Sequence, residues 1–126
     1  MIQRYRAWHR ELGRMMPIKN MWFQDGSVEE LELNDTVMND YITAYPDEIE
    51  LMQSTGFKDK NGKEIFEGDI LGTKNGLLNG VVEYRTDLGM WTNSLIRYNN
   101  FERLCNIAGD REILGNIYEN KELLDA

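Results

Sequence analysis

Residues 51–71, LMQSTGFKDKNGKEIFEGDIL, decide the fold of this chain. Asn61 and Gly62 stand between two lysines inside a run of short strand-forming segments. Asparagine and glycine both accept positive φ cheaply, and the pair is typical of a two-residue type I′ hairpin turn. We therefore expect a tight antiparallel hairpin over residues 58–64.

A second reversal follows directly, at Glu67, Gly68 and Asp69. We expect Gly68 at positive φ and expect Asp69 to accept hydrogen bonds from backbone N–H groups of its own turn. Short runs between closely spaced turns indicate antiparallel β structure rather than βαβ units. The fold class is therefore predicted to be mainly β, with a short C-terminal helix capped by Asn120.

Alternation of apolar and polar residues predicts the remaining strands. Residues 3–8 and 15–18 are expected to pair around Gly13, and residues 21–23 and 28–33 to form a hairpin across Asp25 and Gly26. Further strands are predicted over 49–54, 81–85, 90–92 and 113–118. The pattern over 67–92 resembles a small SH3-like barrel. Residues 35–45 fit a short helix capped by Asp35 and a loop equally well.

The length of 126 residues predicts one domain covering 1–126. Cys105 is the only cysteine, which excludes an intrachain disulfide and suits a reducing cytoplasm. We expect it to be a buried, inert thiol. No apolar run approaches the roughly 20 residues needed to span a bilayer, and no apolar stretch follows the basic N-terminus. A soluble cytoplasmic protein without membrane association is expected.

The net charge of −8 is unevenly distributed along the chain. Residues 1–19 contain five lysines and arginines against one acidic residue, Glu11. Residues 20–57 contain nine aspartates and glutamates and no lysine or arginine. An acidic protein is repelled by phosphate backbones at long range, which disfavours general nucleic-acid binding. We expect the two segments to lie close together and to offset one another's charge.

The basic N-terminus nevertheless contains a candidate binding surface, formed by Arg4, Arg6, Trp8 and His9. On an alternating strand Arg4, Arg6 and Trp8 share one face, where arginine can hold phosphate and tryptophan can stack on a base. In the alternative interpretation, Tyr5 and Trp8 anchor the core and the arginines face the acidic segment.

Three blocks of sequence carry a resemblance to a known family. Residues 5–8, YRAW, are similar to an opening FRAW motif, and residues 114–124, LGNIYENKELL, are similar to a closing IGNIYENPELL motif. Between them, residues 51–70 match the central motif almost throughout. In this order the blocks resemble the YopX family of phage and prophage proteins over nearly the whole chain. His9 stands where the family usually has an acidic residue, and Lys121 where it has a proline.

The resemblance implies a YopX-like, mostly β domain and a phage or prophage setting inside a bacterial cell. It carries over no activity, cofactor or catalytic residue. The residues that its motifs mark are expected to be structural turn residues: Gly56, Asp59, Asn61, Gly62, Glu67, Gly68, Asp69, Gly115, Asn116 and Tyr118.

Glu64, Glu67 and Asp69 offer a possible enzymatic site, because they are close in sequence and could converge on a metal ion. General acid–base or two-metal chemistry would need one of them buried with a raised pKa. Acidic residues in turns are more often simply solvated. Asp59 and Asn61 begin an EF-hand spacing that then fails, and no Cys/His pair supports zinc. We therefore expect no metal, no cofactor and no catalytic residue.

The function predicted from these observations is that of a non-catalytic accessory protein that binds a protein partner. A nucleic-acid-associated module using the basic N-terminal strand is the first alternative, and a metal-dependent enzyme is the second. Exposed edge strands favour a homo-oligomer. Five aromatic residues are expected in the core or in a subunit interface: Trp8, Trp22, Phe23, Trp91 and Tyr118.

Overall fold

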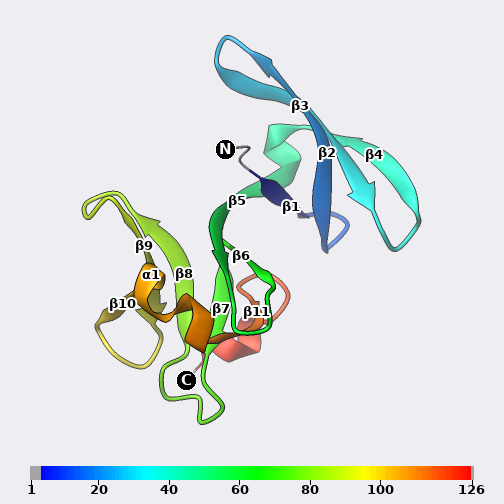
Figure 1. The fold of residues 1–126 in the computed structure, drawn as a ribbon. Coiled ribbons are helices and arrows are strands. Elements are labelled where there is room, and N and C mark those ends of the chain that lie inside the picture. The colour runs from blue at the N-terminus through cyan, green and yellow to red at the C-terminus, as the bar shows by residue number, and fades with distance from the viewer. Residues whose placement is uncertain (1–3, 126) are drawn as a thin grey trace. The chain divides into compact units, whose positions relative to one another are not determined.

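The computed structural model describes residues 4–125 (Figure 1). Its contacts divide the chain into two compact units, Met1–Gln53 and Ser54–Ala126. Gln3, the first residue of the first predicted strand, lies outside the described residues. The prediction of a single domain over 1–126 stays a prediction. No helix within 4–125 has the length and apolar character needed to cross a membrane.

Antiparallel strands build the first unit, in the spatial order β4-β3-β2-β1-β5. Strand β5 continues into the second unit, where its later residues pair with β6. A single 3₁₀ turn, η1 (Pro46–Glu48), precedes β5. The strands are β1 (Tyr5–His9), β2 (Arg14–Gln24), β3 (Ser27–Asp35), β4 (Asp40–Ala44) and β5 (Ile49–Lys58).

The predicted hairpin across Asp25 and Gly26 is confirmed. Both residues have positive φ, 52° and 81°, as a tight two-residue turn between twisted strands requires. The two short strands predicted over 15–18 and 21–23 are instead one long strand, β2. Pairing with β3 along residues 18–24 keeps β2 extended through its polar middle.

The prediction for residues 35–45 was wrong in both of its forms, because the segment is a hairpin between β3 and β4. Asp35 does accept backbone hydrogen bonds, from Val37 N–H at 3.1 Å and Met38 N–H at 3.3 Å, as a helix cap would. Asn39 then turns the chain back at a φ of 53°. Ladder pairing with β3 thus replaces the helix, and Val37 and Met38 are left exposed at the tip.

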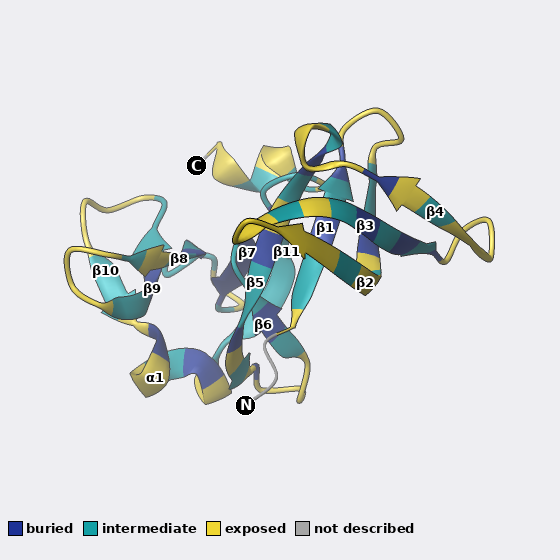
Figure 2. Cartoon of the chain, turned by 90° about the horizontal axis from the view of Figure 1, so that it is seen from above, coloured by how far each residue is buried: buried dark blue, intermediate teal, exposed yellow. Residues whose placement is uncertain are grey.

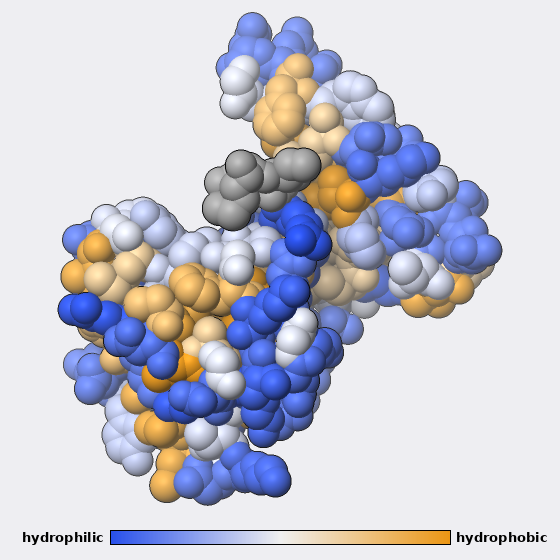
Figure 3. Space-filling view, in the orientation of Figure 1, coloured by the Kyte–Doolittle hydropathy of each residue, from blue (hydrophilic) through white to orange (hydrophobic). Residues whose placement is uncertain are grey.

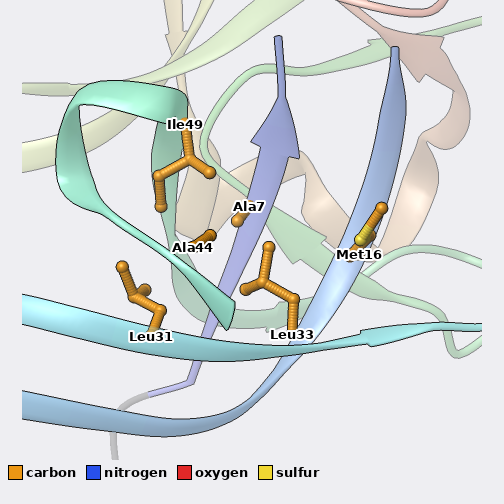
Figure 4. Packing of buried hydrophobic residues seen from close by; sticks show 6 residues of the cluster. All are labelled: Ala7, Met16, Leu31, Leu33, Ala44 and Ile49. Atoms are coloured by element: carbon orange, nitrogen blue, oxygen red, sulfur yellow. The ribbon is translucent and has the colours of Figure 1, made fainter. Parts of the chain in front are cut away.

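The core of the first unit lies under one face of β3 (Figure 4). Leu31 and Leu33 alternate onto that face as the sequence predicts, and both are completely buried. Burying a side chain of this size contributes about 1.5–3 kcal/mol. Strands β2 and β4, beside β3, are largely exposed (Figure 2). The buried cluster consists of Ala7, Met16, Leu31, Leu33, Ala44 and Ile49.

The second unit contains a five-stranded antiparallel sheet in the order β10-β9-β8-β7-β11. Strand β11 therefore lies at the opposite edge from β10, and the chain reaches it through α1 (Leu104–Ile107) and η2 (Ala108–Asp110). The other elements are β6 (Glu64–Phe66), β7 (Asp69–Gly72), β8 (Gly80–Arg85), β9 (Met90–Leu95), β10 (Phe101–Arg103), β11 (Glu112–Asn116) and η3 (Lys121–Leu124).

Ile65, Leu71, Val82 and Leu104 form the buried core of this unit, together with Ala108. The mainly β, antiparallel fold class is confirmed. The predicted C-terminal helix is present as the short 3₁₀ segment η3. Because β10 and β11 are the two edges of its sheet, the sheet does not close into a barrel, and the SH3-like likeness stays a prediction.

The hairpin between β5 and β6 is confirmed, but its turn is not the predicted type I′. Gly62 has a φ of 80°, whereas Asn61 does not have positive φ. Asp59 closes the loop through its backbone, which donates to Lys63 O at 2.8 Å and accepts from Gly62 N–H at 3.0 Å. The loop is therefore longer, with a single left-handed residue at Gly62.

The left-handed backbone at Gly62 generates a stability prediction. Gly62→Ala should lower the free energy of unfolding by about 1–2 kcal/mol, because alanine at positive φ brings Cβ close to the backbone. Apart from Gly62 and its two chain neighbours, no heavy atom lies within 4 Å of the added Cβ, so the cost is conformational only. Urea denaturation at pH 7 would measure it.

Gly109→Ala is the matched control, since Gly109 also has open space around it but does not have positive φ. Its free energy of unfolding should stay within about 0.5 kcal/mol of the parent or rise. Equal losses in the two variants would contradict the turn assignment.

Candidate functional site

The basic N-terminal strand β1 lies inside its sheet, paired with β2 on one side and β5 on the other. Arg6 and Trp8 share one face of the strand and are half-buried, while Arg4 precedes the strand and is exposed. Ala7 and His9 lie on the opposite, buried face. The backbone of β1 is thus paired with both neighbouring strands, and only its side chains can contact a binding partner.

His9 is separated from the other three candidate residues by this alternation. It is buried, and its Nδ1 accepts a hydrogen bond from Leu12 N–H at 3.2 Å. His9 therefore braces the turn between β1 and β2. The four predicted binding residues do not form one surface, because His9 faces away from Arg6 and Trp8.

Ion pairs confirm that the basic and acidic segments offset one another. Arg10 pairs with Glu50 at 2.7 Å, and Lys19 Nζ pairs with Glu32 at 3.1 Å. Both pairs are substantially exposed, so each contributes less than about 1 kcal/mol to stability. Their main consequence is that these two basic residues are already neutralised within the chain.

Asp35 is only 2% exposed and forms an ion pair with Arg14. Burial acts to raise the pKa of Asp35, but it is outweighed by hydrogen bonds from Met38 and Val37 N–H and by the Arg14 guanidinium. The pKa therefore lies below its ordinary value, and the carboxylate stays charged. Arg14, like Arg10 and Lys19, forms an ion pair within the fold.

Asp59 is the buried centre of the central motif. Its Oδ1 accepts the N–H groups of Asn61 and Lys63, each at 2.9 Å, and its Oδ2 accepts Ile113 N–H at 3.1 Å. Burial acts to raise its pKa, but these three backbone hydrogen bonds and the Lys63 charge hold the pKa below its ordinary value. Asp59 thereby joins the β5–β6 turn to β11.

The second turn of the motif is held in the same way. Asp69 is buried and its Oδ2 accepts Phe66 N–H at 2.8 Å, which confirms the predicted backbone bond. Gly68 has a φ of 87°; its N–H donates to Val82 O at 2.8 Å and its carbonyl accepts Ile117 N–H at 3.0 Å. The turn is thus tied to both β8 and the closing motif.

Asn116 organises the closing motif. Its Oδ1 accepts the N–H groups of Tyr118 at 3.0 Å and Glu119 at 2.8 Å. Asn120 Oδ1 accepts Asn116 N–H at 3.1 Å, so Asn120 does not cap η3 as predicted. A Cβ on Gly115 would lie 2.2 Å from that same Asn120 oxygen, which explains the glycine.

Two further motif residues occupy turn-like or half-buried positions. Gly56 has a φ of 82° within β5, where the pairing with β6 shifts register between Ser54 and Lys58. Tyr118 is half-buried beyond β11, just before η3. These positions agree with a structural role for the motif.

The three carboxylates of the metal-site hypothesis are not brought together as a metal-binding group. Ser54 Oγ donates to Glu64, Asp69 turns its carboxylate to its own backbone, and Glu67 is half-buried. Within residues 4–125 no group of three His, Cys, Asp or Glu side chains is placed to hold a metal ion. The three residues are close in sequence but lie in β6, in the following turn and at the start of β7, where Glu64 and Asp69 have separate hydrogen-bond partners.

A polar pocket of about 430 Å³ lies against β8, β9 and β10, lined in part by Glu83, Arg85, Ser94 and Phe101. Asp87 pairs with Arg85 at 2.8 Å, which raises the pKa of Arg85 and lowers that of Asp87. The guanidinium also lies over the Phe101 ring, 5.3 Å from its centroid. The positive charge of Arg85 at the pocket is therefore already paired, and Glu83 accepts a hydrogen bond from Ser94 Oγ at 2.7 Å.

Two aromatic residues that the sequence placed in the core or an interface are far from buried. Trp22 is 45% exposed and Phe23 is 61% exposed, both near the turn of the β2–β3 hairpin. Trp91, by contrast, packs against the second core. The clue available in the sequence was the acidic segment around Trp22 and Phe23, which cannot supply a buried neighbourhood for both rings.

The expectation of a buried Cys105 was also wrong, because the thiol is exposed on α1. This helix has four residues and buries only Leu104. Leu104 and the half-buried Ile107 pack against the second core, whereas Cys105 and Asn106 between them face solvent.

Comparison with known proteins supports the family resemblance. The family model described as YopX protein matches residues 4–125. The chain is also similar to a solved structure titled "Crystal structure of protein EF1440 from Enterococcus faecalis", with a TM-score of 0.66 and 27% sequence identity. That match covers 98% of this chain and 99% of the other. A comparison with curated proteins found no match.

Asp59 generates the second stability prediction. Asp59→Ala removes the acceptor of three backbone N–H groups and should lower the free energy of unfolding at pH 7 by about 2–4 kcal/mol. Asp110→Ala, at an exposed position, is the control and should change it by less than about 0.5 kcal/mol. Urea denaturation would distinguish the two, and similar values would contradict the bracing role.

The lowered pKa of Asp59 makes stability depend on pH. A carboxylate with a depressed folded-state pKa stabilises the protein above its unfolded pKa of about 3.9, and this contribution is lost as pH falls through the folded pKa. Asp59→Asn should therefore show a smaller loss of unfolding free energy than the parent between about pH 5 and 2. Parallel pH profiles would contradict the assignment.

Proposed function

The chain belongs to the YopX family, and from that premise we propose that it is a non-catalytic accessory protein of a phage or prophage. Its role is to bind a protein partner in the cytoplasm of the bacterial host. The exposed thiol of Cys105, which is not part of a disulfide, supports a reducing compartment, because disulfides form and persist in oxidising ones.

The exposed β2–β3 hairpin is the observation that carries this proposal. It presents Trp22 and Phe23 to solvent, and aromatic side chains contribute most to the binding energy of protein interfaces. Figure 3 shows hydrophobic side chains at the surface beside the hydrophilic tip of this hairpin. A large aromatic ring that is exposed to water adds little to the stability of the fold, but it can bury apolar surface when a partner binds.

Self-association is part of the proposal. Strand β4 is one edge of the first sheet, and β10 and β11 are the edges of the second, so each presents backbone groups that another copy can pair. We propose that a homo-oligomer forms through such an edge. Light scattering during gel filtration tests this: a monomeric mass at all concentrations up to about millimolar removes self-association from the proposal.

The nucleic-acid alternative has less support. Arg10, Arg14 and Lys19 are already paired with carboxylates, and β1 is a central strand. If nucleic acid is bound nonetheless, Arg4→Ala/Arg6→Ala should weaken that binding and reduce its salt dependence. Binding that is unchanged in this double variant would exclude the basic strand as the contact.

Capture of partners from lysate of the bacterial host tests the protein-binding role directly. The tagged full chain should retain a stoichiometric protein after nuclease treatment, identified by mass spectrometry. Recovery that disappears with nuclease would favour the nucleic-acid alternative. Absence of any retained macromolecule above the level seen with an unrelated acidic protein would contradict both.

A further inference from the structure

The outer face of the β2–β3–β4 sheet, opposite the core, presents an ordered set of aromatic and polar side chains. Leu31 and Leu33 point into the core, so the alternating residues Glu30 and Glu32 point outward. The strand register places Trp22 opposite Glu30 and Thr43 opposite Glu32. The outer-face residues include Asn20, Trp22, Glu30, Glu32, Asn34, Tyr41 and Thr43.

Lys19 of the same chain occupies one position on this face. Its Nζ lies 3.9 Å from the centroid of the Tyr41 ring and 3.1 Å from Glu32 Oε1. An aromatic face and a carboxylate thus hold one primary ammonium group together, through a cation–π contact and an ion pair. Tyr41 is half exposed in spite of this contact, so the arrangement is open to solvent.

Trp22 and Glu30 form a second aromatic–carboxylate pair on the same face. Directly opposed residues on neighbouring strands have their Cβ atoms about 5 Å apart, within reach of one ammonium or guanidinium group. Within residues 4–125 no cation lies over the Trp22 ring and no ion pair reaches Glu30. Tryptophan is also the strongest aromatic partner for a cation.

Charge decides between the possible occupants of this face. The surrounding segment, residues 20–57, contains no basic residue until Lys58 follows it, and the whole chain has a net charge of −8. A nucleic acid would be repelled, and so would the same face of a second copy. A basic protein segment is attracted at long range and supplies the cation that Trp22 and Glu30 lack.

We propose that the outer face of β2–β3–β4 is a docking surface for a lysine- or arginine-bearing segment of a partner protein, with one basic side chain held between Trp22 and Glu30. This inference rests on the proposed protein-binding function and specifies its surface and the chemistry of its partner. Lys19 on Tyr41 and Glu32 marks the neighbouring position along the same face.

The test uses the full chain and a synthetic peptide of alternating lysine and glycine, acetylated and amidated at its ends. Titration of the ¹⁵N-labelled protein should shift amide resonances of β2, β3 and β4. Trp22→Ala and Glu30→Gln should each weaken the affinity by about threefold or more, the size expected for an exposed cation–π contact or ion pair. The amide spectrum of each variant also verifies its fold.

Matched controls separate this contact from attraction by net charge. Glu11→Gln removes the same charge from an exposed position in the same unit, and Tyr98→Ala removes an exposed ring from the second unit. Both should leave the affinity within about twofold of the parent. The proposal is overturned if Glu11→Gln weakens binding as much as Glu30→Gln, if a glutamate–glycine peptide binds equally well, or if no amide of β2, β3 or β4 shifts.

Lysate capture with the Trp22→Ala/Glu30→Gln variant separates this inference from the proposed function. If the parent retains a protein and the double variant loses it, both stand. If both retain that protein equally, the binding function stands and this docking surface is wrong. If neither retains any protein, the proposed function fails, and with it this assignment of a partner.

Discussion

The buried carboxylate of Asp59 is the constraint on which the second unit depends. A charge removed from water costs several kcal/mol unless hydrogen bonds replace its hydration, and here three backbone N–H groups do so. Two of them belong to the β5–β6 turn, whereas the third, Ile113 N–H, lies 54 residues away in β11. The turn and β11 must therefore be in place together. Lys60 N–H, which donates to Arg111 O at 2.9 Å, reinforces the same junction.

The same device recurs at three other reversals of the chain. Asp35, Asp69 and Asn116 each turn a side-chain oxygen toward N–H groups of their own turn. Short polar side chains do this well, because they reach the backbone without crossing the core. Acidic residues of the motif are consequently used for architecture, and the acidic residues that remain for recognition are those on strand surfaces, such as Glu30.

Local features of the fold followed well from the residues, and features that depend on distant neighbours did not. Gly62 and Gly68 have the positive φ that their turns predicted, and Asp69 bonds to its own turn. Residues 35–45 failed as a prediction because the backbone bonds of a short helix compete with those of a strand ladder, and β3 was available as a partner. The predicted cap at Asn120 was wrong for a similar reason. The Asn120 side chain accepts a hydrogen bond from Asn116 N–H and not from the first turn of η3.

The sequence by itself determined the strand class, the positions of most reversals and the family, because turn preferences and alternation act within a few residues. It also determined that opposite charges would offset one another. Only the tertiary structure decided which aromatic ring stands beside which charge. Trp22 lies opposite Glu30, and the Lys19 ammonium lies over the Tyr41 ring, through the register of β2, β3 and β4. A shift of one residue would send each side chain to the other face, and this register depends on a core assembled from the whole unit.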